Sequence, residues 1–289
     1  MKEVFRRLRV LGGSAAQREL MVAEAFEAGA GGLEERDGPP AALWIYVPES
    51  HAAGVCDALA KFMGDGVELL DDGPEPERQW SEAWKEGLEA IRVSPRLVVR
   101  PPFVEPVPGH HGLDLVIAPG QAFGTGAHAS TRLALELLDE LAADGRAAGR
   151  VLDVGCGSGV LALAALGLGA TTALGFDLDP LASEASQEAA GVNQLADRLH
   201  LFTGGIEALG ETRFDLVLAN LLKRESLPIL SALARVLRPG GRLVLSGLLV
   251  SERGEIEDAL ARNGLAAIGE RRRTDPSGEP WLGLLATTL

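Results

Sequence analysis

The ten residues Val151–Val160, Val-Leu-Asp-Val-Gly-Cys-Gly-Ser-Gly-Val, constrain the fold of this chain more than any other stretch. An apolar run ends in an acid, a glycine-dense segment follows, and an Ala/Leu-rich helical pattern begins at once. This order predicts a strand, a tight loop and a helix N-terminus, which is the usual geometry for binding a nucleotide-like cofactor. Gly155, Gly157 and Gly159 lack a Cβ, so the backbone can turn sharply and approach a ligand closely.

Two cofactor classes use such a loop. The dinucleotide fingerprint G-x-G-x-x-G fails in one register, because position 160 is Val, and is met weakly in the next register, which ends at Ala162. The pattern Asp153-x-Gly-x-Gly-x-Gly159 is closer to the first motif of S-adenosylmethionine (SAM) methyltransferases. There the acid can face a cationic methionine moiety. The loop alone leaves both classes open, together with a purely structural turn.

The pattern after residue 150 predicts a doubly wound parallel sheet, because strands and helices alternate. We expect strands at 150–154, 172–177, 199–203, 214–219 and 242–247, with helices at 158–168, 180–193, 225–237 and 252–263. The rhythm then changes, and 265–269 and 281–286 flank the polar stretch 271–280, which reads as a hairpin with a long turn. A seven-stranded, Rossmann-like α/β sheet ending in an antiparallel hairpin is typical of class I methyltransferases and unusual in dinucleotide folds.

The first 71 residues predict a separate small α+β domain. Strands at 4–11, 32–36, 42–47 and 67–70 alternate with helices at 14–28 and 50–63, which is the ferredoxin-like βαββαβ order. We interpret residues 1–71 as a substrate-recognition domain and the acidic stretch Asp71–Glu77 as the domain boundary. Residues 72–95 are expected to form a linker helix carrying Trp80 and Trp84 on one face, and residues 96–289 the methyltransferase domain.

Composition narrows the partners and the compartment. The chain has 289 residues, 46% hydrophobic residues and a formal net charge of −14. This charge argues against a nucleic-acid partner and suits a cationic cofactor or a basic protein. Cys56 and Cys156 lie far apart, which fits a reducing compartment. The chain shows no signal core and no apolar run of about 18 residues, so we expect a cytoplasmic monomer without a membrane contact.

Polar residues at the predicted strand ends are candidates for the site. Asp177 follows the second strand, twenty residues after Gly157, where an acid accepts hydrogen bonds from both ribose hydroxyls. Asn220 ends the fourth strand, and its carbonyl oxygen is placed to accept a hydrogen from an incoming amine. The glycine-containing loop that carries Phe123 resembles a lid over the cofactor. The adjacent pair His110 and His111 lacks acidic or cysteine companions, so we predict no metal.

The motifs together resemble one family, the methyltransferases of large-subunit ribosomal protein eleven. The resemblance rests on Gly120-x-Ala-Phe-Gly-Thr-Gly-x-His128-x-x-Thr131, Asp153-Val-Gly-Cys-Gly-Ser-Gly159, Asp177-Leu-Asp-Pro180, Ala219-Asn220 and Ser246-Gly247. It covers nearly the whole chain. It implies that the N-terminal module recognises the ribosomal protein and that the C-terminal domain transfers methyl groups from SAM to lysine side chains and the α-amine. By position, Thr131, Gly155, Asp177 and Asn220 would contact SAM, with Asn220 also near the substrate amine and Phe123 over the cofactor.

Two segments depart from the family pattern. Ala118 stands where the family has an acid, and Leu221-Leu-Lys-Arg-Glu-Ser226 replaces the usual sequence after the Asn. The second change alters the substrate side of the site. Three alternatives therefore stay open: a SAM-dependent lysine methyltransferase of another protein or a small amine, a SAM-binding regulatory protein without turnover, and an NAD-dependent oxidoreductase.

Overall fold

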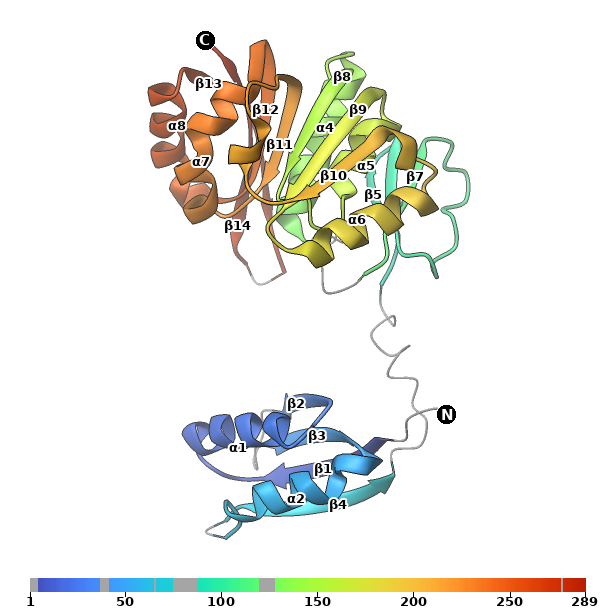
Figure 1. The fold of residues 1–289 in the computed structure, drawn as a ribbon, viewed down its shortest axis with the longest axis vertical. Coiled ribbons are helices and arrows are strands. Elements are labelled where there is room, and N and C mark those ends of the chain that lie inside the picture. Colours follow the sequence, from blue (N-terminus) through green and yellow to red (C-terminus); the bar gives the residue numbers. More distant parts are fainter. Residues whose placement is uncertain (1–4, 37–41, 65, 75–87, 120–127, 277) are drawn as a thin grey trace. The chain divides into compact units, whose positions relative to one another are not determined.

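The structure, a computed structural model, describes residues 5–36, 42–64, 66–74, 88–119, 128–276 and 278–289. The chain divides into two compact units, Met1–Gly87 and Leu88–Leu289 (Figure 1). Each unit has its own hydrophobic core, as expected of an independently packed domain.

The smaller unit has the predicted βαββαβ order. Its elements are β1 (Phe5–Leu11), α1 (Ala15–Glu27), β2 (Gly32–Arg36), β3 (Ala42–Pro48), the short 3-10 helix η1 (Glu49–His51), α2 (Ala52–Ala60) and β4 (Glu68–Pro74). The strands form one antiparallel sheet in the order β2-β3-β1-β4. Alternate residues such as Leu8, Val10 and Ile45 are fully buried against Met21 of α1 and Val55 of α2. The ferredoxin-like fold is confirmed.

The acidic stretch that was predicted to begin the connector belongs in part to this sheet. Strand β4 runs to Pro74, beyond the predicted end at residue 70. Asp72 lies beside β1 and accepts hydrogen bonds from Arg7 and Arg9; these bonds, the one from Arg9 first, hold the pKa of its carboxyl below the usual value. Asp71 pairs with Arg6 at 2.8 Å. The acidic residues continue the strand because arginines on the neighbouring strand pair with them.

The predicted linker helix stays a prediction over most of its length, because Trp80, Trp84 and the rest of 75–87 lie outside the described residues. For the last part of this segment the prediction of a helix is wrong. Residues Ile91–Ser94 form strand β5, which pairs with β6 (Leu97–Arg100), and β6 pairs in parallel with β7 (Leu113–Val116). The sequence also predicts strands near 96–100 and 113–118, which correspond to β6 and β7. Strand β5 was not predicted, because it is only four residues long and lies within the predicted linker helix.

The larger unit is built on the predicted doubly wound sheet. The strands are β8 (Gly149–Val154), β9 (Ala170–Asp177), β10 (Leu199–Thr203), β11 (Phe214–Asn220), β12 (Leu237–Leu249), β13 (Leu265–Thr274) and β14 (Pro280–Thr288), in the order β10-β9-β8-β11-β12-β14-β13. The first five positions in this order are parallel to one another, and β14 lies antiparallel between β12 and β13. The class I methyltransferase sheet with its antiparallel C-terminal hairpin is confirmed.

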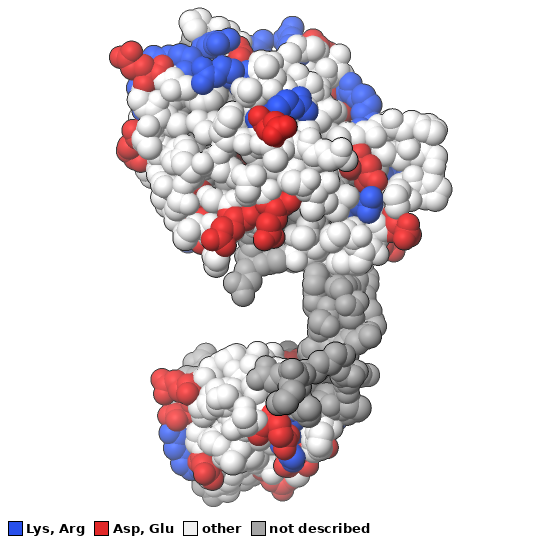
Figure 2. Space-filling view, turned by 45° about the vertical axis from the view of Figure 1, so that its right-hand side comes forward, with Lys and Arg blue, Asp and Glu red and all other residues white. Residues whose placement is uncertain are grey.

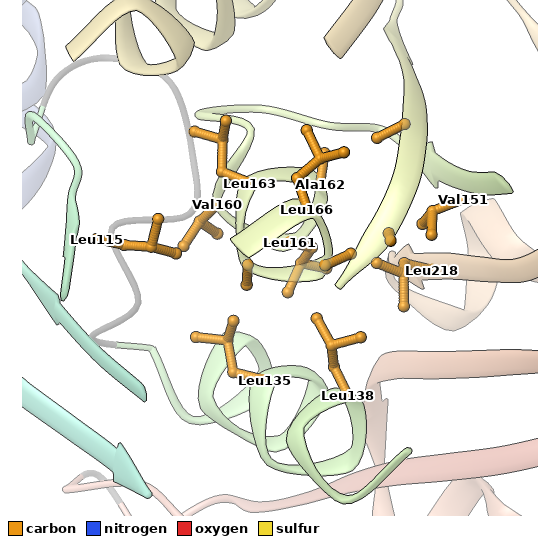
Figure 3. Close-up of a cluster of buried hydrophobic side chains, with 14 of the residues drawn as sticks. Leu115, Leu135, Leu138, Val151, Val160, Leu161, Ala162, Leu163, Leu166 and Leu218 are labelled. Atoms are coloured by element: carbon orange, nitrogen blue, oxygen red, sulfur yellow. The ribbon is translucent and has the colours of Figure 1, made fainter. Parts of the chain in front are cut away.

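Helices cover both faces of this sheet. The core that joins α4 (Ala129–Ala143), α5 (Val160–Gly167) and α6 (Pro180–Val192) to one face also takes in β6 and β7. Figure 3 shows the centre of that core, where Leu135 and Leu138 of α4 face Leu161 of α5. Helices α7 (Lys223–Val236) and α8 (Arg253–Arg262) cover the other face. Among the described residues, no helix combines the length and apolarity needed to cross a bilayer.

The C-terminal hairpin differs from its prediction in one respect. The arginine run 271–273, which was predicted to lie in a long turn, belongs to β13, and the turn is confined to Asp275–Glu279. The ladder with β14 continues from Arg271 opposite Gly283 to Thr274 opposite Pro280. Charged residues are unusual in strands, but these arginines pair with glutamates of α4 and β13.

Candidate active site

A pocket of about 760 Å³ opens at the carboxyl ends of the parallel strands, where open α/β sheets bind their ligands. It is lined by residues at the carboxyl ends of four strands: Gly155–Gly157 at β8, Asp177–Asp179 at β9, Gly205–Glu207 beyond β10 and Asn220–Leu222 at β11. Gly247 of β12, His128 before α4, Ser130 and Thr131 of α4, and Trp281 of β14 complete the lining. Of the sequence-predicted site residues, Thr131, Gly155, Gly157, Asp177 and Asn220 therefore meet in one pocket. Phe123 lies outside the described residues.

The glycine loop has backbone conformations that only glycine adopts easily. Gly155 and Gly157 have φ values of +66° and +52°, in the left-handed region that disfavours side chains. A Cβ added to Gly155 would lie 2.7 Å from Cδ2 of Leu221. The loop is therefore pressed against the wall formed after β11.

Asp177 connects the end of β9 to the glycine loop. Its Oδ2 accepts a hydrogen bond from the backbone N–H of Gly157 at 3.0 Å, and its Oδ1 accepts one from Asp179 N–H at 3.1 Å. A carboxylate oxygen has two acceptor sites, so each oxygen keeps one for a ligand hydroxyl. The backbone bonds fix the carboxylate in the pocket wall.

Asp153 does not line the pocket, so it does not face a bound ligand there as the first-motif comparison suggested. It is buried, and its Oδ2 accepts a hydrogen bond at 3.0 Å from Ala162 N–H in the first turn of α5. Burial raises the pKa of this carboxyl to about 7, opposed by that hydrogen bond. Its role is to hold the start of α5 against the end of β8.

Cys156 lies between two of the loop glycines, and its thiol is not suited to act as a nucleophile. Burial raises its pKa to about 12, whereas a reactive cysteine needs a lowered pKa. The Ser186 hydroxyl donates to the carbonyl of Gly157 at 2.8 Å. Ser186 therefore fastens the loop to α6, and the cysteine is a packing residue.

Asn220 and Thr131 form the polar centre of the pocket. The Asn220 amide donates from Nδ2 to Oγ1 of Thr131, a fully buried hydroxyl, at 3.1 Å. Oδ1 of Asn220 is buried and has no hydrogen-bond partner among the described residues. Because a buried acceptor without a partner is costly, this oxygen is suited to accept a hydrogen bond from a ligand in the pocket.

The start of α4 is attached to the strand ends by side-chain contacts. The Ser246 hydroxyl of β12 donates to the carbonyl of Ser130 at 2.7 Å. The His128 ring caps the helix by accepting from Ser130 N–H and packs edge-on against Trp281, with ring centroids 4.6 Å apart. Helix α4 is thereby fixed over the carboxyl ends of β11 and β12.

The sequence did not identify Trp281 or Glu207 as site residues. Trp281 is brought in by the hairpin, and no local pattern distinguishes it. Glu207 follows the carboxyl end of β10, so the rule that ligands bind at strand ends contained a signal for it. With Asp177, Asp179 and Glu225, it gives the pocket an acidic rim. His110, by contrast, bonds the carbonyl of Leu113 away from this pocket.

The sheet order, the antiparallel hairpin and the pocket at the strand ends define this chain as a class I methyltransferase. Enzymes with this fold use a methyl donor of the S-adenosylmethionine type, so the NAD-dependent alternative is set aside.

The chain belongs to the ribosomal protein L11 methyltransferase (PrmA) family, whose sequence profile matches residues 59–276. A ribosomal protein L11 methyltransferase of Sorangium cellulosum is 38% identical over 90% of this chain and 89% of its own length. One of Deinococcus radiodurans is 37% identical over 94% and 95%. The crystal structure of a ribosomal protein L11 methylase from Lactobacillus delbrueckii subsp. bulgaricus matches with a TM-score of 0.60 and 30% identity, over 69% of this chain and 98% of that chain.

Proposed function

We propose that this enzyme transfers methyl groups from S-adenosylmethionine to amines of ribosomal protein L11, at lysine side chains, the N-terminal α-amine, or both. The printed names of its relatives support the substrate. One observation carries the reaction type. The hydrogen bond from Nδ2 to Thr131 fixes the Asn220 side chain. Its buried Oδ1 has no hydrogen-bond partner among the described residues and can accept a hydrogen bond from a donor on a ligand. A neutral amine has such a donor.

The residues of the pocket fit this cofactor. Its volume of about 760 Å³ lies in the range of small-molecule sites. Gly155 lies beside the pocket at a position where a Cβ would come within 2.7 Å of Leu221 Cδ2, so the loop can take this path only with glycine. Asp177 has free acceptor sites for ribose hydroxyls. Thr131 and Asn220 add polar groups to the lining of the same pocket. The cofactor supplies an electrophilic methyl group on a sulfonium, which is already activated for transfer.

The chain's own residues then have to position the amine. Oδ1 of Asn220 accepts one N–H and so directs the nitrogen lone pair toward the methyl carbon. The apolar wall of Leu221, Ile229 and Trp281 disfavours a charged ammonium, because burial opposes the charged form. Positioning of this kind supplies a large part of catalysis when the donor is already reactive.

The acidic rim favours a basic substrate. Asp177, Asp179, Glu207 and Glu225 surround the opening, and carboxylates raise the local concentration of cationic side chains. Figure 2 shows one group of acidic residues low on the larger unit, with others spread over the rest of the visible face. We assign recognition of the substrate protein to residues 1–71, and we place the enzyme in the cytoplasm, where ribosomal proteins are made.

The segment after Asn220 bears on substrate choice. Leu221, Leu222 and Glu225 line the pocket, so the departure from the family pattern lies on the wall that an incoming amine meets. Lys223 is turned away, toward Glu252 and Glu255 of the neighbouring α8 region. Methylation of a different protein is the second candidate function for this reason.

Mass spectrometry of purified L11 after incubation with the enzyme and SAM tests the proposal. We expect mass increases of whole methyl groups on lysine residues or the N-terminus. The Asn220→Ala variant serves as the control and should leave L11 unmodified over the same time. Methylation of other proteins in a ribosome-depleted extract, with none on L11, would replace L11 as the substrate.

A further inference from the structure

The edge of the large sheet opposite the pocket is rich in arginine. This amino-terminal edge, where the parallel strands begin, carries eight arginines: Arg146, Arg150, Arg198, Arg213, Arg235, Arg238, Arg242 and Arg262. Among the described residues, the acids Asp144, Asp197, Glu211 and Asp215 lie near the same strand starts. We call these eight residues the arginine row. Figure 2 shows Lys and Arg gathered along the upper margin of the larger unit. A chain with a net charge of −14 thus has one positively charged edge.

The arginine row differs from the other arginines of this unit in its partners. Elsewhere, eight arginines form ion pairs with carboxylates. In the row, four donate to backbone carbonyls, at Ala170, Gly210, Glu211 and Gly240. Among the described residues, only Arg238 of the row pairs with a carboxylate, that of Asp215. A carbonyl fixes a guanidinium without cancelling its charge, so the row stays positive.

The centre of the row is hollowed. Arg146, Arg238 and Arg242 line a recess of about 280 Å³ with Asp215 and the turn Pro239–Gly241. Within the described part of the chain, Nε of Arg242 is buried there without a hydrogen-bond partner, and Arg146 is exposed with no ion pair. Guanidinium groups bind phosphate through paired N–H donors. The recess is suited to one phosphate group.

The row is long as well as charged. It follows the starts of the strands from Arg198 beside β10 to Arg262 before β13. Seven strands at about 4.8 Å spacing give the edge a length of roughly 29 Å. Three of these arginines lie in strands, Arg150 in β8 and Arg238 and Arg242 in β12, and the others lie at helix ends or in turns beside them. The positive charge thus extends along the edge, which suits an extended polyanion such as a phosphate backbone.

We propose that the arginine row binds the phosphate backbone of RNA, as a surface separate from the methyl-transfer pocket. Contacts of this kind position a nucleic acid without reading its sequence. The choice of RNA rests on the proposed function, because RNA is the polyanion with which ribosomal proteins assemble. The net charge of the chain argued against a nucleic-acid partner, but a sum over the chain does not describe how charges are distributed.

Fluorescence anisotropy with a labelled RNA duplex, at 50 to 200 mM salt and without SAM or L11, tests the proposal. We expect binding whose affinity falls steeply with salt, as counterion release requires. The variant Arg146→Gln/Arg238→Gln/Arg242→Gln should weaken binding at least about tenfold and lower the salt slope by about three. The matched control Arg271→Gln/Arg272→Gln/Arg273→Gln removes the same charge from ion-paired arginines and should bind like the parent.

A second test uses a variant that should bind RNA more tightly than the parent enzyme. A misfolded variant would lose affinity, so a gain cannot result from damage to the fold. Asp215→Asn removes the one carboxylate among the described residues that line the recess, and it should tighten RNA binding several-fold. No binding by the parent enzyme at 50 mM salt, or equal losses in the two triple variants, would overturn the proposal. Tighter binding of polyglutamate or of a DNA duplex than of RNA would overturn it too. The first triple variant should methylate free L11 at the parent rate, so failure of RNA binding leaves the proposed function intact.

Discussion

Asn220 and Thr131 lie 89 positions apart in the chain, and a single 3.1 Å hydrogen bond joins their side chains at the centre of the pocket. The bond decides which way the amide faces. With Nδ2 committed to the threonine hydroxyl, Oδ1 is the atom left for a ligand. The first two predictions follow from this pair.

Replacing Asn220 with Ala removes the acceptor for the substrate amine. We expect kcat for methyl transfer to fall about 100-fold or more, the range seen when a positioned polar group is lost, while the Kd for SAM changes less. Asn263→Ala, at the end of α8 and far from the pocket, is the matched control and should keep kcat. Equal losses of kcat in both variants would contradict the assigned role.

Replacing Thr131 with Val tests the orienting bond alone. Valine keeps the shape of the side chain but leaves Nδ2 of Asn220 without its acceptor, which costs about 1–3 kcal/mol and allows the amide to turn. We expect kcat to fall roughly tenfold, and Thr131→Ser to restore it because serine keeps the hydroxyl. A threonine-to-serine variant as slow as the valine variant would refute the idea.

Asp177→Asn should weaken cofactor binding. A hydrogen bond to a charged group contributes about 1.5–3 kcal/mol, so the Kd for SAM measured by calorimetry should rise about ten- to hundredfold. Asp179→Asn is the control, since asparagine caps a helix as well as aspartate does and Asp179 caps α6. If both changes weaken SAM binding alike, general acidity of the rim rather than Asp177 is responsible.

The buried carboxyl of Asp153 should make stability depend on pH. Its folded-state pKa of about 7 lies above the ordinary value of 3.8, so between these values the folded state holds a proton that the unfolded state has released. The free energy of unfolding therefore falls as pH rises through this window, by about 4 kcal/mol at most. Asp153→Asn keeps an acceptor for Ala162 and should flatten the profile in urea denaturation from pH 4 to 8. The exposed Asp144→Asn should leave it unchanged.

Gly247→Ala should be strongly destabilising. Gly247 has φ +82°, and an added Cβ would lie 2.6 Å from the carbonyl oxygen of Leu221, a backbone atom that is hard to move. We expect a loss of about 2 kcal/mol or more in the free energy of unfolding. Gly254→Ala, in α8 with no atom near the added Cβ, should be neutral or stabilising by about 0.5–1 kcal/mol.

Local patterns explain why much of this site was predictable. The glycine loop and Asp177 belong to consecutive strand–turn–helix units, and periodicity places both at carboxyl ends of strands. Trp281 was missed because its position depends on β14 lying beside β12, a long-range pairing that no local pattern contains. The orientation of Asp153 was missed because its partner, the amide of Ala162, depends on the path of the loop. Asp71 and Asp72 read as solvated linker because their arginine partners lie about 65 positions earlier.

The position of β14 has a consequence for the synthesis of this protein. Strand β14 follows β13 in the chain but lies between β12 and β13 in the sheet, so β13 has no partner strand in this sheet until β14 has emerged from the ribosome. Until then the nascent chain exposes the edge of β12, whose residues Leu243, Val244 and Leu245 are buried in the finished fold. Exposed apolar strand edges promote aggregation. The nascent chain is therefore most exposed to aggregation between the synthesis of β12 and that of β14, and a product truncated before β14 would lack both Trp281 and the strand that joins β12 to β13.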